Sequence, residues 1–208
     1  MTANFLHSIL GDTARAMQAQ AGSRASYAAM EAQADGRPDV LGPREAAFIA
    51  ARDSFYMASV TQDGWPYVQH RGGPKGFLRL LGPGRVGFAD FRGNRQYMSA
   101  GNIVNHGRVA LILVDYPAQR RMKMIGRSRR IALADDPDTV LQLTPDGYAA
   151  TPEAAVLIDV VAFDWNCPQH ITPRFTAAEL TPVMGKLVDD LEALKAENAA
   201  LKARLAGA

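Results

Sequence analysis

The strongest constraint on this chain is a series of short apolar runs, separated by glycine and proline turns, that fills its middle. Hydrophobic side chains alternate with others in these runs, a pattern typical of strands. The runs span residues 55–61, 65–71, 77–81, 85–89, 109–116, 122–133 and 155–163. Gln62-Asp63-Gly64 and Gly82-Pro83-Gly84 are tight-turn sequences, so neighbouring strands should pair antiparallel. Many short strands with close turns predict a barrel or a sandwich.

Helical patterns precede and interrupt the strands. Residues 1–52 are rich in Ala, Met, Gln and Arg, and the spacing of Phe5 and Ile9 predicts one or two helices there. Pro43 is placed to open a further short helix. Two more helices are expected between strands, at 96–105 and around 137–143.

The last segment carries a seven-residue repeat. Leucines recur at 180, 187, 194 and 201, with Met184, Leu191, Asn198 and Leu205 at the alternating positions, which predicts a leucine zipper over 180–206. An asparagine in the seam favours a two-stranded parallel pair, and Glu197 can pair with Lys202 across it. The alternative is an amphipathic helix that packs on its own domain.

Length and composition limit the domain organisation and the cellular compartment expected for this chain. The 208 residues, with 23 basic and 21 acidic side chains, suffice for a core without disulfides or metals. We expect three parts: a helical cap (1–52), a barrel (53–175) and the zipper. A single cysteine, Cys167, and the lack of a signal sequence or a long apolar stretch predict a cytoplasmic protein without membrane contact.

A basic run between 120 and 130 raises the question of nucleic acid. In a strand, Arg121, Lys123 and Arg127 share one face and Met122 and Met124 the other, so the run is explained as a solvated face. Neither interleaved aromatic residues nor a recognition helix accompanies the run, and Pro168, Pro173 and Pro182 interrupt the approach to the zipper. We therefore expect no nucleic-acid partner.

Three segments combine the residue types that ligand sites use. They are 69–77, with Arg71 beside two glycines; 88–96, with Asn94 and Arg95 where a strand meets a helix; and 164–171, Asp-Trp-Asn-Cys-Pro-Gln-His-Ile. A helix start beside an arginine suits an anion, with Asn94 as helix cap or phosphate donor. Each segment also has a purely structural interpretation, as a turn, a capped helix or a packed corner. Cys167 and His170 lack further partners for a nucleophile or a metal site, so no metal is expected.

Taken in order over residues 44–174, these segments resemble the FMN-binding split barrel of the pyridoxamine 5′-phosphate oxidase-like superfamily. The resemblance implies a mainly β, α+β fold: a six-stranded antiparallel split β-barrel, dimeric, with FMN at the subunit interface. It also implies the cofactor-binding residues, which are Gln69, His70, Arg71, Gly72, Phe88, Ala89, Asp90, Asn94, Arg95, Gln96, Arg121, Met122, Trp165 and Asn166. Asn94, Arg95 and Gln96 match the triplet that clasps the phosphate, and Arg121 and Met122 match residues that reach the flavin ring from the other subunit.

The function expected from the resemblance is a flavin-dependent oxidoreductase acting on an unidentified small molecule. The substrate-side candidates are His170 and His70. Arg71 is followed by Gly-Gly-Pro instead of the expected lysine, and the late segment has Cys-Pro-Gln-His instead of Arg-x-His, which argues against the vitamin as substrate. The alternatives are a flavin or haem carrier or sensor on the same fold and a deazaflavin-dependent reductase.

Overall fold

The computed structural model describes residues 2–166 and 169–207, and they fall into two units. The first comprises residues 1–115 and 120–169, and the second 116–119 and 170–208. Cys167, considered above as a nucleophile or metal ligand, lies outside the described residues. No helix among the described residues is long and apolar enough to cross a membrane.

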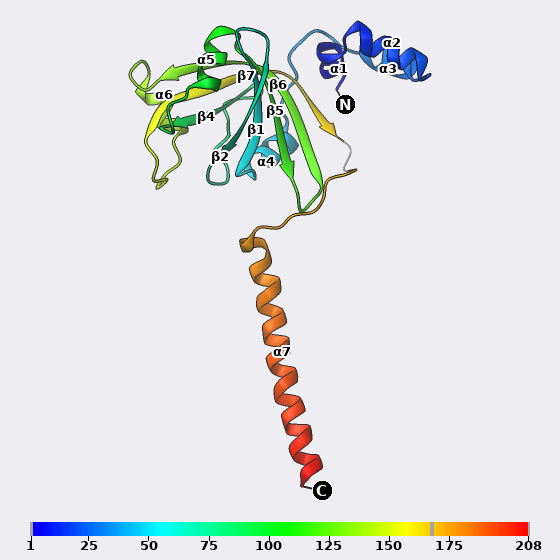
Figure 1. The fold of residues 1–208 in the computed structure, drawn as a ribbon, viewed down its shortest axis with the longest axis vertical. Coiled ribbons are helices and arrows are strands. Elements are labelled where there is room, and N and C mark those ends of the chain that lie inside the picture. The colour runs from blue at the N-terminus through cyan, green and yellow to red at the C-terminus, as the bar shows by residue number, and fades with distance from the viewer. Residues whose placement is uncertain (1, 167–168, 208) are drawn as a thin grey trace. The chain divides into compact units, whose positions relative to one another are not determined.

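The first unit is built on one antiparallel sheet with the strand order β2-β1-β5-β6-β7-β4-β3 (Figure 1). The strands are β1 (Ser54–Val60), β2 (Pro66–Gly72), β3 (Arg79–Leu80), β4 (Arg85–Phe91), β5 (Arg108–Asp115), β6 (Arg120–Ala132) and β7 (Pro152–Asn166). The expected antiparallel α+β class is confirmed, with seven strands instead of six. The added strand, β3, is a two-residue edge paired with β4.

Side-chain contacts join strands that lie far apart in the order of the sheet. Arg71 of the edge strand β2 forms an ion pair of 2.8 Å with Asp90 of β4, which lies near the opposite edge. Phe55 of β1 likewise contacts Phe88 of β4, with ring centroids 5.4 Å apart. The sheet therefore curls into a barrel whose two edge strands are β2 and β3.

The predicted turns form where glycine allows a left-handed backbone. Gly64 has φ 85°, and the Thr61 N–H bonds the Trp65 carbonyl to close the β1–β2 hairpin. Gly82, with φ 110°, similarly joins β3 to β4.

Strand alternation fills the core from the sheet's inner face. Phe55, Met57 and Ser59 of β1 are buried, while the residues between them are partly exposed. The predicted division of β6 is confirmed, because Met122 and Met124 are 0% exposed and Arg121, Lys123 and Arg127 face outward.

The helices of the first unit are α1 (Ala3–Ile9), α2 (Asp12–Gln20), α3 (Arg24–Glu31), α4 (Pro43–Ala50), α5 (Met98–Asn105) and α6 (Pro137–Leu143). Of these, α1, α4, α5 and α6 contact the strands, and α3 packs on α1 and α2. The N-terminal segment thus forms three helices before α4, because Gly11 and the left-handed Gly22 divide it. The Thr2 hydroxyl links α1 to the barrel: its oxygen lies 2.7 Å from an Asp39 carboxylate oxygen and 2.7 Å from the Phe163 carbonyl, and the two acceptors share its one proton.

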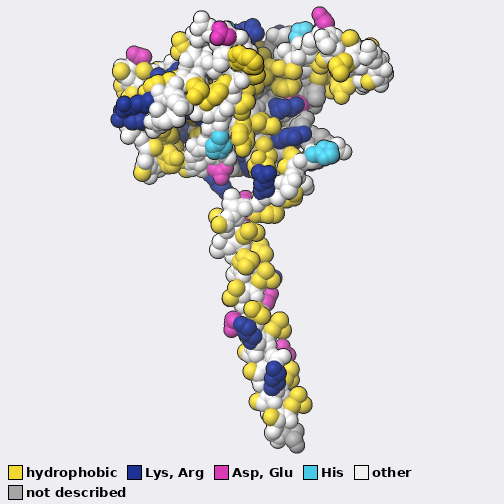
Figure 2. Space-filling model, viewed as in Figure 1, with side chains coloured by type: hydrophobic (Ala, Val, Ile, Leu, Met, Phe, Trp, Pro, Cys, Tyr) yellow, Lys and Arg dark blue, Asp and Glu magenta, His cyan; other side chains and the backbone are white. Residues whose placement is uncertain are grey.

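The second unit contains one long helix, α7 (Ala177–Ala206). A capping box of Thr176 and Glu179 begins it. Pro182 lies inside the helix, which corrects the expectation that it interrupts the approach to the zipper; the proline removes one backbone hydrogen bond from a helix of 30 residues. The seam side chains are exposed, with Leu187 at 56% and Leu191 at 50%, and apolar side chains run along the helix (Figure 2).

Candidate ligand-binding site

A pocket of about 110 Å³ lies where β2, β4 and the start of α5 meet. We call it the α5 pocket. It is lined by Tyr67, Gln69, Arg71, Asp90, Phe91, Gly93, Asn94, Arg95, Gln96, Tyr97, Met98, Ser99, Ala100 and Glu153. Two of the segments singled out in the sequence, 69–77 and 88–96, are thus brought together.

Alternation along β2 decides which of its residues enter the pocket. Tyr67, Gln69 and Arg71 line it, whereas the intervening residues are exposed on the other face. The His70 ring lies edge-on to Tyr56, with centroids 5.5 Å apart. The structure therefore brings Gln69 and Arg71 to the pocket and directs the His70 side chain away from it.

One hydrogen-bond donor of Arg71 is left without a partner in the part of the chain that the structure describes. One of its Nη atoms bonds Asp90 at 2.8 Å, and its guanidinium lies 5.6 Å from the centre of the Phe88 ring. Its Nε is buried and has no hydrogen-bond partner among the described residues. A buried donor without an acceptor is costly, so this atom favours a ligand that brings an acceptor.

The start of α5 offers further donors. The residue before the helix, Tyr97, is left-handed with φ 51°, and no side chain caps the first turn among the described residues. Asn94, expected as a possible cap, instead accepts from the Gln96 N–H at 3.2 Å, and the helix begins at Met98, two residues later than expected. Because an α-helix leaves its first N–H groups unpaired and positive, this end of α5 suits an anion.

Two buried hydrogen bonds hold α5 in place. Ser99 donates to the Gln69 side chain at 2.7 Å, and Asn102 donates to Ser59 of β1 at 2.9 Å. The donors of the helix start are therefore fixed relative to β2 before any ligand binds.

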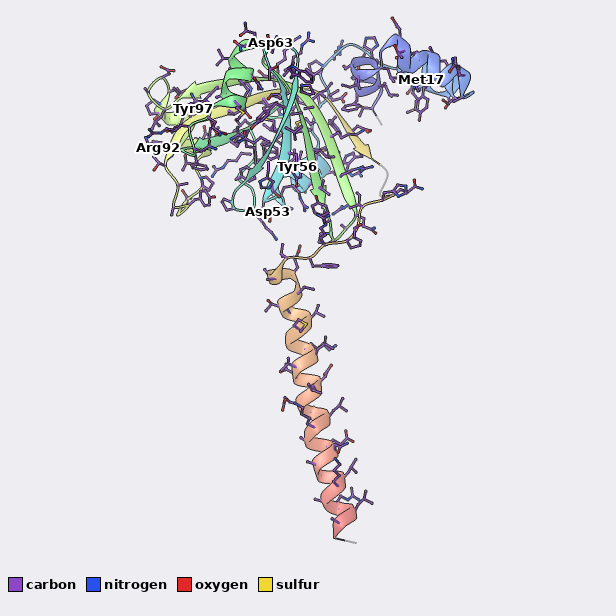
Figure 3. The ribbon with its side chains drawn as sticks, in the orientation of Figure 1. Met17, Asp53, Tyr56, Asp63, Arg92 and Tyr97 are labelled. Carbon is purple, nitrogen blue, oxygen red and sulfur yellow. The ribbon has the colours of Figure 1, made fainter. Side chains whose placement is uncertain are left out.

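Glu153, at the start of β7, places a carboxylate on the pocket wall. It accepts from Arg92 Nε at 2.9 Å and from the Tyr97 hydroxyl at 3.4 Å, and Arg92 and Tyr97 are neighbours in Figure 3. The hydrogen bond from Arg92 lowers the pKa of Glu153 below its usual value, helped by the charges of Arg92 and Arg95. The carboxylate is therefore ionised at neutral pH.

The charges around the pocket leave a positive balance. Asp90 is shared by Arg71 and Arg130, and Glu153 is paired with Arg92. Arg71 and Arg95 line the pocket, whereas Arg92 and Arg130 lie outside the lining and pair with its two carboxylates. Counted with these two partners, the region has four arginines for two carboxylates, an excess that suits a phosphate group.

Seven of the expected cofactor contacts whose side chains the structure describes lie outside the pocket lining: His70, Gly72, Phe88, Ala89, Arg121, Met122 and Trp165. Met122 is 0% exposed, Phe88 1% and Ala89 5%, so their side chains are enclosed in apolar clusters. Gly72 faces the His70 ring, and a Cβ on Gly73 would lie 2.7 Å from Phe77. The second glycine thus lets the chain pack against its own Phe77 ring.

The remaining expected residues lie near the end of β7 or beyond it. The Trp165 indole donates to Glu45 at 2.7 Å, with the Arg44 guanidinium 4.2 Å from its ring centre, so it packs on α4. Arg121 pairs in register with Asn166, whose side chain is not described. His170 has φ 65° and belongs to the second unit. Arg121 and Trp165 do not line the α5 pocket.

Sequence reasoning missed several of the lining residues. Tyr67 has a usable signal, because it lies two and four positions before Gln69 and Arg71 on one strand face. Ser99 lies in the first turn of the expected helix. Glu153 has no local signal, because the pairing of β4 with β7 brings it to the pocket. Among the described residues, no three His, Cys, Asp or Glu side chains are grouped to hold a metal ion.

Solved structures of other proteins align with this fold at low sequence identity. HupZ from Group A Streptococcus, in a variant form, aligns with a TM-score of 0.50 at 13% identity over 61% of this chain and 99% of its own. An FMN-binding protein from Syntrophomonas wolfei aligns with a TM-score of 0.43 at 12% identity, and the alignment covers 58% of this chain and 81% of that protein. A pyridoxamine 5′-phosphate oxidase-related, FMN-binding protein from Nostoc punctiforme aligns with a TM-score of 0.40 at 16% identity, and the alignment covers 54% of this chain and 73% of that protein.

Sequence comparison gives the family. No curated protein matches the chain. The family model described as pyridoxamine 5′-phosphate oxidase matches residues 41–163, more than half of the chain and nearly the whole barrel. The chain therefore belongs to the pyridoxamine 5′-phosphate oxidase family.

Proposed function

We propose that this chain binds FMN, with the flavin phosphate in the α5 pocket. The observation that carries the proposal is the convergence of an uncapped helix start and the unpaired Arg71 Nε on one small pocket. Gln69, Asn94, Arg95 and Gln96 line the same pocket, and these are residues that the family resemblance assigns to the cofactor.

The pocket fits the phosphate in charge and in donors. Arg92 and Arg130, outside the lining, pair with the two lining carboxylates, so Arg71 and Arg95 can face a phosphate, and the first-turn N–H groups of α5 supply neutral donors. Gln96 stands where the family pattern has a lysine, and we expect Arg92 to offset the missing charge. Arg92 lies beside the pocket, held by Glu153.

When bound, the flavin would supply hydride transfer at its N5 to or from a small molecule. The protein's part is to orient the ring and to offset the negative charge that reduction adds. Because Arg71 is assigned to the phosphate, Arg121 from the other subunit is the arginine proposed to offset this charge. We propose an oxidoreductase, working in the cytoplasm on a substrate other than the vitamin.

We further propose a homodimer with the flavin at its interface. The outer face of β1 and β2 exposes Tyr56 at 42% and Val68 at 60%, and the connection between the two strands exposes Trp65 at 73%; exposed apolar side chains of this kind are typical of a protein contact surface. In such a dimer Arg121, Trp165, Asn166 and His170 are the residues proposed to approach the flavin bound by the other subunit. The α7 seam, with Asn198 at one of its positions, is proposed to pair in parallel with its copy.

A comparison of FMN with riboflavin tests the phosphate assignment. Titration of the protein stripped of any bound molecule should show FMN binding at least about tenfold tighter, because riboflavin leaves the charged donors unpaired. Equal affinities for the two flavins would refute the assignment.

Reduction of the bound flavin tests the reaction. An oxidoreductase should show bleaching of bound FMN by NADH or NADPH and its return when an acceptor is added. Bound FMN that stays oxidised would support the carrier or sensor instead. Preferential binding of haem or of a deazaflavin would replace FMN as the cofactor.

A further inference from the structure

A second cavity lies outside the proposed flavin site. It is a groove of about 470 Å³ between the end of α1 and the outer face of β1, β5 and β6, and it shares no lining residue with the α5 pocket. We call it the α1 groove. Its volume is in the range of sites that hold small organic ligands, about 300–1,000 Å³.

The wall of the α1 groove is mainly apolar. Ile9 of α1 closes one side and is 57% exposed, and Ala58, Val60 and Ile125 line the sheet. A surface of this kind favours a ligand with an apolar body.

Two arginines add a charge that the protein does not neutralise. Arg108 of β5 and Arg127 of β6 are direct partners in the antiparallel register, both are exposed, and both line the groove. Cross-strand partners project from the same face, and like charges in this arrangement repel. Neither guanidinium forms an ion pair within residues 2–166 and 169–207.

The carboxylate beside Arg127 in the sheet register forms ion pairs with other arginines. Asp159 of β7 is the register partner of Arg127 on its other side. Its carboxylate bonds Arg85 at 2.5 Å and Arg129 at 3.1 Å. The pair of arginines in the groove therefore remains a site for an anion from outside.

We propose that the α1 groove binds a small amphiphilic anion. Its carboxylate or phosphate head lies between Arg108 and Arg127, and its apolar body lies along Ala58, Val60 and Ile125. Guanidinium groups bind both kinds of head through paired charge-assisted hydrogen bonds. This site shares no lining residue with the proposed phosphate pocket, although Ala58 is the register partner of Val68 on the proposed dimer face.

Calorimetric titration of the full-length protein with three ten-carbon probes tests the proposal. Sodium decanoate and decyl phosphate carry the two heads, and decanol carries none; all are used below micelle formation. At least one anion should bind about tenfold or more tightly than decanol. A preference between the two anions identifies the head. Failure of both anions to bind, or equal binding of decanol, overturns the proposal.

Variants locate the binding. Arg108→Gln with Arg127→Gln should reduce anion binding to the level of decanol. Arg37→Gln with Lys75→Gln is the control, since it removes two exposed charges outside both pockets and should leave binding unchanged. Ala58→Leu fills the groove without changing charge and should weaken both anions and decanol. Equal losses from the control variant would show a general charge effect and overturn the site.

Sedimentation of the same variants distinguishes the competing occupant. If a second copy of the chain fills the groove, the anions will not bind and the double glutamine variant will have a lower assembly mass. That pair of results also overturns the proposal.

Discussion

Replacing Arg71 by leucine separates its two roles, ligand binding and support of the barrel. In the structure the guanidinium gives one donor to Asp90 at 2.8 Å and keeps a buried Nε without a partner. We expect the ligand to lose one charge-assisted hydrogen bond, worth about 1.5–3 kcal/mol. FMN should therefore bind roughly 10- to 150-fold more weakly.

The same change affects stability through Asp90. That carboxylate keeps Arg130, 3.5 Å away, but its side chain is only 14% exposed, so part of its charge is left uncompensated. We expect a loss of about 1–3 kcal/mol in the free energy of unfolding, less than the roughly 3–5 kcal/mol of breaking a fully buried pair, because Arg130 remains beside Asp90. Denaturant unfolding without FMN measures this term separately from binding.

A double variant distinguishes the two effects. Arg71→Leu with Asp90→Leu removes the unpaired carboxylate and should recover most of the lost stability, while FMN affinity stays low. Arg129→Leu, on the outer face, serves as the control and should keep full affinity. Unchanged FMN affinity in Arg71→Leu, or its recovery in the double variant, would refute the assigned role of Arg71.

Four further changes test other parts of the molecule. The hydrogen bond from Arg92 lowers the pKa of Glu153 in the folded protein, so the stabilising contribution of Glu153 is present above about pH 4.5 and is lost as the pH falls below that value. Glu153→Gln should therefore flatten the acid side of a profile of melting temperature against pH, and an unchanged profile would contradict this. Met124→Ala, at a fully buried position, should cost about 2–5 kcal/mol in urea unfolding, and a cost under 1 kcal/mol would mean that the core is wrongly placed. A Cβ on Gly126 would lie 2.7 Å from the Asp159 carbonyl, so Gly126→Ala should cost about 1–3 kcal/mol by the same assay, and full stability would count against this strand contact. Asn198→Leu should make α7 pairing tighter but allow higher assemblies, seen by sedimentation; an unaltered mass distribution argues against a seam at this position.

Local patterns predicted most of the barrel. Alternation in β6 separated Met122 and Met124, which are buried, from Arg121, Lys123 and Arg127. The glycine turns at 62–64 and 82–84 predicted the antiparallel pairing. The N-terminal helices were less well predicted, because Gly11 and Gly22 divide an otherwise continuous helical composition.

The pocket was only partly predictable. Gln69 and Arg71 could be placed from the segment that carries them, and strand periodicity alone would have separated His70 from them. The left-handed backbone at Tyr97 and the approach of Glu153 depend on tertiary contacts, which a local pattern does not encode. Pro182 shows the same limit, since a long helix tolerates one proline that the sequence alone interprets as a break.

The identity of the molecule that copurifies with the protein tests the central claim most directly. Mass spectrometry and the absorption spectrum of the ligand released from the purified full-length chain should both identify FMN, and the amount per chain should fall in Arg71→Leu. A haem, a deazaflavin or an unphosphorylated flavin would contradict the account, as would FMN retained in full by the variant.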